Sequence, residues 1–132
     1  MLSREFDFLS NYVDLMKLRY ADEVEIKFSV PENFTEAEVP VLLFISYLEN
    51  AFKYGASYQN KSIIETSFEI VNGHLQFTCY NTKSVFSDNH QNGGIGLQNS
   101  RQRLELIYND RFNLTVNETD ETFTVKLLIP LT

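Results

Sequence analysis

The sequence predicts an α+β fold in which a mixed five-stranded sheet carries about three helices on one face, a two-layer α/β sandwich. Segments with helical apolar spacing are interleaved with segments in which apolar and polar residues alternate. Their order is helix, strand, helix, two strands, helix, two strands. The chain has 132 residues, of which 43% are hydrophobic, enough for one domain with a real core. We therefore expect a single domain over residues 1–132.

The first half of the chain predicts two helices and one strand. Apolar residues recur every three or four positions in 4–20, which indicates an amphipathic helix with Ser3 as its N-cap. Residues 23–30 alternate in the manner of a strand. A second, mostly apolar helix is expected over 40–54 because proline is favoured in a first helical turn. Gly55 is expected in the left-handed conformation that ends many helices.

The second half predicts two hairpins with a loop and a helix between them. Residues 62–70 and 74–81 flank the Asn72–Gly73 dipeptide, a strong signal for a two-residue hairpin turn. The polar stretch 82–94 is expected to be a loop. The last three elements, a helix and the two strands of a closing hairpin, are expected over 96–108, 111–118 and 121–130.

The second helix carries one polar stripe, formed by Ser46, Glu49, Asn50 and Lys53 at intervals of three and four. Such a stripe faces either bulk water, which the pattern alone favours, or a cleft that holds a polar ligand. The Gly-rich turn GGIGLQN (93–99) shifts the balance, because it runs directly into the third helix. Glycines let a backbone approach a ligand closely, and a helix N-terminus suits phosphate.

Charge and cysteine content exclude several classes of protein. The net charge of -7 argues against direct nucleic-acid binding, so local donors must hold any anionic ligand. No apolar run reaches the roughly 20 residues of a membrane span, and the N-terminus has no signal-peptide pattern. Cys79 is the single cysteine, so no internal disulfide forms and a cytosolic location is expected. Because it alternates with apolar residues, Cys79 is expected to be an inert buried thiol.

Two segments carry a resemblance to a known family. ENAFKYG (49–55) and GGIGLQNSRQRLELIY (93–108) resemble the N box and Gly box of the ATP-binding domain of sensor histidine kinases. These domains share the GHKL, or Bergerat, nucleotide fold. The subgroup that the chain looks most like is the LytS/YehU-like kinases, and the resemblance extends over nearly the whole chain.

The resemblance implies that the polar stripe lines a cleft for ATP and Mg²⁺. Asn50 would coordinate Mg²⁺, and Glu49 would act as a base or orient the Mg²⁺ shell. Lys53 would supply positive charge to the phosphates or to an ATP lid over 82–94. The further nucleotide-binding residues that the resemblance implies are Asn81, Gly93, Gly94, Gly96, Leu97 and Asn99.

Three features depart from the family pattern. The DxGxG adenine box is absent, and Asn81 stands where its aspartate is expected, although an amide oxygen can still accept a hydrogen bond from adenine. FISYL (44–48) replaces a usual Gln-Pro pair, for which we expect only a difference in helix packing. The phosphoacceptor motif is missing, because His74 and His90 lie in unsuitable contexts. We therefore expect the chain to be the cytoplasmic catalytic fragment of a longer, membrane-anchored kinase. The isolated fragment is expected not to phosphorylate itself.

The resemblance implies transfer of the ATP γ-phosphoryl group to a histidine on an upstream dimerisation region of a homodimeric full-length protein. A response regulator, by family resemblance of the LytTR type, would then accept it. Two alternatives stay open. The chain could be a degenerate pseudokinase or interaction domain that keeps the fold without phosphotransfer. It could also be an ATPase of the gyrase or MutL kind in which Glu49 activates water, although the short chain argues against this.

Overall fold

The computed structural model describes residues 1–20, 23–55, 62–83 and 94–131, with backbone only for 94–96. The helices are α1 (Leu2–Tyr20), α2 (Ile45–Gly55) and α3 (Gly94–Tyr108). The strands are β1 (Val24–Ser29), β2 (Ser62–Val71), β3 (His74–Thr82), β4 (Asn113–Glu118) and β5 (Thr122–Pro130). Within these described ranges no helix is both long and apolar enough to cross a bilayer.

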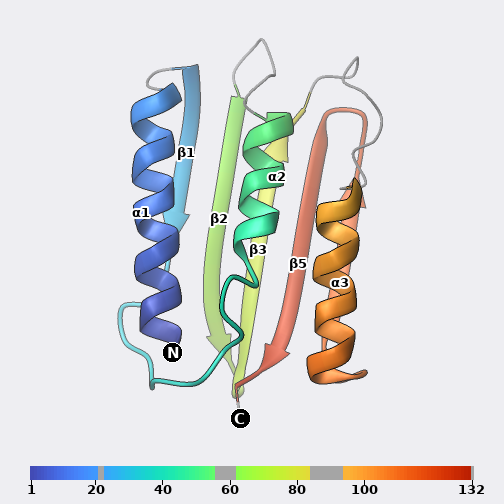
Figure 1. The fold of residues 1–132 in the computed structure, drawn as a ribbon. Coiled ribbons are helices and arrows are strands. Elements are labelled where there is room, and N and C mark those ends of the chain that lie inside the picture. Colours follow the sequence, from blue (N-terminus) through green and yellow to red (C-terminus); the bar gives the residue numbers. More distant parts are fainter. Residues whose placement is uncertain (21–22, 56–61, 84–93, 132) are drawn as a thin grey trace.

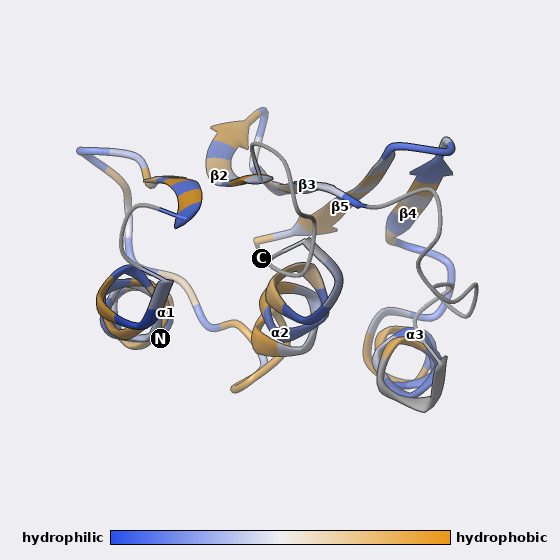
Figure 2. Cartoon of the chain, turned by 90° about the horizontal axis from the view of Figure 1, so that it is seen from above, coloured by the Kyte–Doolittle hydropathy of each residue, from blue (hydrophilic) through white to orange (hydrophobic). Residues whose placement is uncertain are grey.

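The five strands form one mixed sheet in the order β1-β2-β3-β5-β4. β1 pairs with β2 in parallel, and the other three pairings are antiparallel. All three helices cover the same face of this sheet (Figures 1 and 2). Alternate residues of β3 and β5 are buried on that face, among them Leu75, Phe77, Val125 and Leu127. The predicted fold class, a two-layer α/β sandwich, is confirmed.

An aromatic cluster joins the start of α2 to the middle of the sheet. The ring centroids of Phe44, Phe68 and Phe77 lie 5.0 to 5.1 Å from one another. Phe6 of α1 extends the cluster, with its ring 5.0 Å from that of Phe68. Phe44, Phe68 and Phe77 are fully buried, and aromatic pairs at such distances contribute roughly 0.5–1.5 kcal/mol beyond their burial.

Helix α2 starts at Ile45, so the prediction that it begins near Pro40 was wrong. Leu42 has a φ of 59°, a left-handed conformation that an α-helix excludes. Its N–H donates to the carboxylate of Glu5 on α1, at 3.4 Å. The carbonyl of Phe44 then accepts the N–H groups of Tyr47 and Leu48, which starts the helix. The chain turns at Leu42 and buries the Phe44 ring, and the helix begins only after these residues.

The first helix also begins differently from the prediction. Ser3 lies inside α1 and is not its N-cap. Its N–H donates to Glu36 at 3.0 Å, and its hydroxyl donates to the other oxygen of the same carboxylate. These bonds hold the pKa of the Glu36 carboxyl below its usual value. A carboxylate from a distant loop therefore satisfies the helix start, which local sequence cannot reveal.

The hairpin turn and the buried cysteine follow their predictions. Asn72 and Gly73 have φ values of 51° and 76°, as a tight two-residue turn requires. Cys79 is buried, and burial raises the pKa of its thiol to about 12. The strand predicted to end at residue 81 runs to Thr82, and α3 starts at Gly94, two residues earlier than predicted. The remainder of the predicted loop, 84–93, lies outside the described residues.

Gly55 ends α2 for a reason other than the one predicted. Its φ is not in the left-handed region. A Cβ atom on Gly55 would lie 2.9 Å from the Cβ of Asn81 and 3.2 Å from both Ile64 Cγ1 and the Thr82 carbonyl oxygen. The position requires glycine because the helix end presses directly on β2 and β3.

We predict that Gly55→Ala destabilises the domain by about 1–3 kcal/mol, because the added methyl group overlaps β3. Helix propensity alone would give the opposite sign, a gain of about 1 kcal/mol. Urea denaturation measures the free energy of unfolding, and Ser10→Ala in α1 is the control, which propensity predicts to be neutral or slightly stabilising. A Gly55→Ala variant as stable as the parent would contradict the close packing of α2 on the sheet.

Candidate functional site

The C-terminal ends of α2 and β3 lie at the upper end of the molecule in Figure 1, and the N-terminal end of α3 points towards the same end. The close approach of Gly55 to Asn81 brings the first two into direct contact. α2 also contacts α3. This end gathers the elements that bear most of the residues predicted for the site.

The polar stripe of α2 is at the surface, as its spacing predicts. Glu49 and Lys53 are exposed, and Ser46 and Asn50 are half-buried. The ammonium of Lys53 lies 5.3 Å from the centroid of the Tyr54 ring. The opposite side of the helix, formed by Tyr47, Leu48, Ala51, Phe52 and Gly55, is buried.

The two edges of the stripe face different helices. Glu49 is three residues from Phe52, whose ring lies 5.8 Å from that of Tyr12 on α1. Burial raises the pKa of Tyr12 to about 12, and the nearby charge of Glu49 adds to the shift. Asn50 is three residues from Tyr47, which lies beside α3. Glu49 thus lies on the side of the stripe near α1, and Asn50 lies about 100° round the helix, on the side of Tyr47.

Tyr47 places a buried polar group between α2 and α3. Its hydroxyl has no hydrogen bond of normal geometry, although Ser100 and Arg101 of α3 lie close by. Burial raises the pKa of Tyr47 to about 12, and its two neighbours oppose the shift. Ser100 is thus the polar neighbour of this buried hydroxyl between the two helices.

Asn81 lies on the buried side of β3 with 1% of its surface exposed. It stands between Ile64 of β2 and Phe123 of β5 in the sheet. Its amide nitrogen donates to the Thr82 carbonyl at 3.0 Å. One of the two N–H donors of the amide is thereby engaged, and the amide oxygen is the group suited to accept a hydrogen bond from a ligand.

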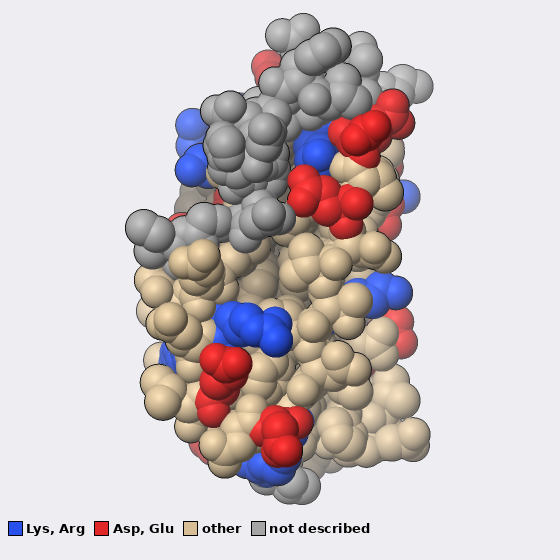
Figure 3. Space-filling model, turned by 90° about the vertical axis from the view of Figure 1, so that its right-hand side faces the viewer, with Lys and Arg blue, Asp and Glu red and all other residues tan. Residues whose placement is uncertain are grey.

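Lys83 lies two residues after Asn81, on the same side of the chain. It was not among the residues predicted for the site. It is 7% exposed, and its ammonium lies 3.2 Å from the carboxylate of Glu118 on β4. Figure 3 views the side formed by α3 and β4, where basic and acidic groups adjoin near the upper end. The alternation of buried residues at 77, 79 and 81 continues to 83, a signal that could have identified this lysine.

The Gly-rich segment is described in part. Gly93 lies outside the described residues. Gly94 and Gly96 form part of the first turn of α3, Leu97 is buried in the core and Asn99 is exposed. Among the described residues, no three His, Cys, Asp or Glu side chains gather as a metal site. Protein-bound Mg²⁺ usually takes one or two protein ligands and completes its shell with phosphates and water.

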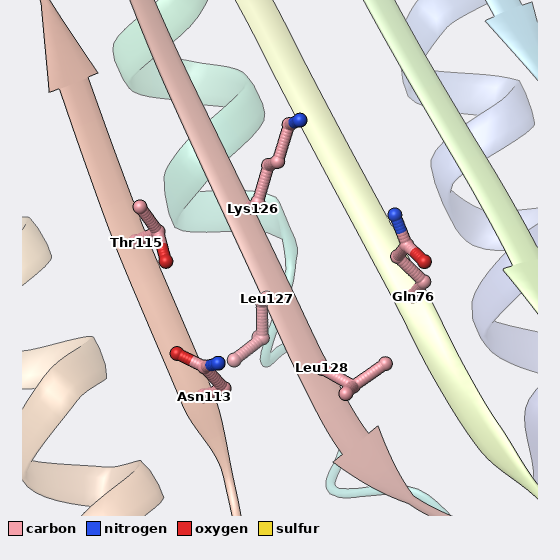
Figure 4. Close-up of a pocket in the computed structure, with 6 residues that line it drawn as sticks. All are labelled: Gln76, Asn113, Thr115, Lys126, Leu127 and Leu128. Atoms are coloured by element: carbon pink, nitrogen blue, oxygen red, sulfur yellow. The ribbon is translucent and has the colours of Figure 1, made fainter.

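Two hollows lie away from this end. One, of about 230 Å³, is on the sheet face opposite the helices and includes Gln76, Lys126 and Leu128 in its lining (Figure 4). The other, of about 490 Å³, is lined by Phe34, Ile70 and Leu131 among others, near the C-terminus. Neither is lined by a residue predicted for the site.

Sensor kinases resemble the chain over nearly its whole length. The sensor protein LytS of Oceanobacillus iheyensis is 24% identical over 150 aligned residues, which cover 98% of this chain and 25% of LytS. The sensor histidine kinase BtsS of Escherichia coli K12 is 18% identical, with coverage of 98% and 23%. The chain thus spans about a quarter of the length of these relatives. No protein-family model matches it.

Solved structures show the same architecture at low identity. The catalytic domain of histidine kinase ThkA superposes with a TM-score of 0.73 at 12% identity, covering 99% of this chain and 92% of that domain. The histidine kinase domain of Erythrobacter litoralis EL346 gives 0.67 at 16% identity, with coverage of 96% and 64%. Full-length ShkA in complex with AMPPNP gives 0.67 at 16% identity, with coverage of 96% and 30%.

The fold is therefore the α/β sandwich seen in histidine kinase catalytic domains. Within this class the chain is similar to LytS-like sensor kinases, which confirms the resemblance predicted from the sequence.

We predict that Glu49→Gln lowers the pKa of Tyr12 but leaves it above the ordinary value of about 10, because burial is the larger cause of its shift. Tyrosinate absorbance, as the difference between each protein and its Tyr12→Phe version, measures this pKa. The pKa of Tyr12 is about 10 in the unfolded chain and about 12 in the folded one. The protonated phenol therefore contributes its full stability below about pH 10, and this contribution is lost as the pH rises through about 12. An unchanged Tyr12 pKa in Glu49→Gln would show that Glu49 does not face α1.

Proposed function

We propose that the chain is the ATP- and Mg²⁺-binding catalytic domain of a two-component sensor histidine kinase. The observation that carries the proposal is the contact of the α2 end with the β3 end, with α3 beside α2, in a chain with the histidine kinase catalytic fold. In the reaction, a histidine nitrogen outside these 132 residues bonds to the γ-phosphorus as the bond to the bridging oxygen breaks, and ADP leaves.

The residues of α2 and α3 fit a Mg²⁺-bound triphosphate. Asn50 offers an amide oxygen, a suitable ligand for Mg²⁺, on the half-buried part of the polar stripe of α2. When bound, the ion would neutralise charge on the phosphate oxygens. Lys53 is an exposed cation one turn further along α2, and the N-terminus of α3 offers free N–H groups and the positive end of a helix dipole.

Glu49 is suited to act on the acceptor. It is exposed on the outer edge of the stripe, away from the side that faces α3, so a histidine from another part of the protein can approach it through solvent. There its carboxylate would accept the N–H of the acceptor imidazole and orient the other nitrogen towards the γ-phosphorus. Asn81 would accept the exocyclic amino group of adenine through its amide oxygen.

The proposed partners are other parts of the full-length protein and a response regulator. They are proposed because the chain covers only about a quarter of its sensor-kinase relatives. The chain matches about a quarter of LytS and BtsS, and we propose that an upstream dimerisation region supplies the acceptor histidine in a homodimer. A response regulator of the LytTR type would then receive the phosphoryl group. We further propose that the full-length protein is membrane-anchored with this domain on the cytoplasmic side.

We predict that the domain binds ATP more tightly with Mg²⁺ than with a chelator, and that Asn50→Ala removes most of this difference. The loss of one ligand should weaken Mg²⁺-dependent binding roughly tenfold or more, while binding in chelator changes little. Calorimetric titration measures both affinities, and Asn11→Ala, an exposed asparagine of α1, is the matched control.

Equal Mg²⁺ dependence in the parent and Asn50→Ala would exclude the metal role of Asn50. If the parent binds no nucleotide in either condition, the interaction-domain alternative replaces the proposed function.

A further inference from the structure

Lys83 is a buried cation that the proposed roles leave unused. Lysine is seldom buried unless it is paired, and the ammonium of Lys83 lies 3.2 Å from the Glu118 carboxylate. Only 9% of the Lys83 side chain is exposed, against 30% of the Glu118 side chain. Within the described part of the chain, this is the ion pair whose charges are most deeply withdrawn from water.

The sheet places this pair beside Asn81. Asn81 of β3 stands opposite Phe123 of β5, which stands opposite Glu118 of β4, so the three form one row across the sheet. Lys83 is two residues beyond Asn81 and projects from the same side of the chain, roughly 6.6 Å along the strand direction. The Lys83 N–H donates to the Glu121 carbonyl at 2.8 Å, which fixes the backbone at this point.

Stability alone gives little reason for a buried ion pair here. Removing two charges from water offsets much of their attraction, and apolar side chains of similar size often replace such pairs without loss. The ammonium has three protons, and a single carboxylate oxygen needs only one. Lys83 and Asn81 thus place an ammonium with protons to spare and an amide oxygen two residues apart on the same side of the chain.

An acceptor beside a donor matches one edge of adenine. The exocyclic amino group of adenine donates, and a ring nitrogen that accepts lies on each side of it, N1 and N7. We propose that Lys83 is a specificity-determining residue for the nucleotide base: its ammonium donates to one of these ring nitrogens while Asn81 accepts the amino group. The inference rests on the proposed function, because it requires that ATP binds at this end of the domain.

The test compares ATP with analogues in which N1 or N7 is replaced by CH. Lys83→Met removes the charge and keeps the length of the side chain. Lys126→Met, an exposed lysine on the opposite face of the sheet, is the matched control. We expect Lys83→Met to weaken ATP binding about 10- to 100-fold, as for the loss of a charged hydrogen bond, and Lys126→Met to leave it unchanged. One of the two analogues should bind the parent as weakly as ATP binds Lys83→Met, and should lose nothing further in that variant.

A second variant and a thermal unfolding measurement test whether Lys83→Met loses affinity only because its fold is damaged. The double change Lys83→Met, Glu118→Met replaces the whole pair by apolar side chains, so no unpaired charge stays behind. It should show the same loss for ATP and the same insensitivity to one analogue.

Two results would overturn the inference alone. ATP affinity could be unchanged in both Lys83 variants, or the affinities for ATP and for both analogues could fall by one common factor, which would place Lys83 at the phosphates or in the fold. If the parent binds neither ATP nor the analogues, the proposed function fails first and the inference with it.

Discussion

Helix α2 is fastened to the sheet at both of its ends, and the arrangement of the candidate site depends on this. At its start the ring of Phe44 packs between Phe68 and Phe77, and at its end Gly55 presses on Asn81. Two fixed points set both the direction of a short helix and its rotation about its own axis. The buried side is therefore fully determined, and the polar stripe must point away from the sheet. A shift at either end would change where Asn50 points.

The candidate site is built from residues of several strands and helices and not from one sequence motif. β3 contributes Asn81, Lys83 directly follows the end of β3, β4 contributes Glu118, and α2 presents its polar stripe at the surface. The proposed roles separate two tasks in space. Metal and phosphate would be held on the side of α3, and the acceptor would arrive on the side of α1.

Periodicity predicted the fold because every element buries one regular face. The spacing in α1, the alternation in β3 and the Asn72–Gly73 turn all had their expected outcomes. The predictions failed where a distant residue decides the local structure. Ser3 is bonded by Glu36, and Pro40 does not start a helix because Leu42 and Phe44 are held by α1 and the sheet. The stripe and the glycines supplied most of the candidate site residues, and their roles stay predictions. The facing of Glu49 and the pairing of Lys83 depend on tertiary contacts that no spacing encodes.

The environment of Cys79 has a practical consequence for the study of this domain. The thiol lies in the core between β3 and α2, near Thr66 and the Tyr47 carbonyl. Its raised pKa leaves almost no thiolate at neutral pH, and thiolate is the form that reacts with alkylating reagents. Cys79, the single cysteine, therefore does not react with maleimides while the chain is folded. A cysteine introduced at any exposed position would be the one reactive group, so a single fluorophore or spin label could be attached without removing any native residue.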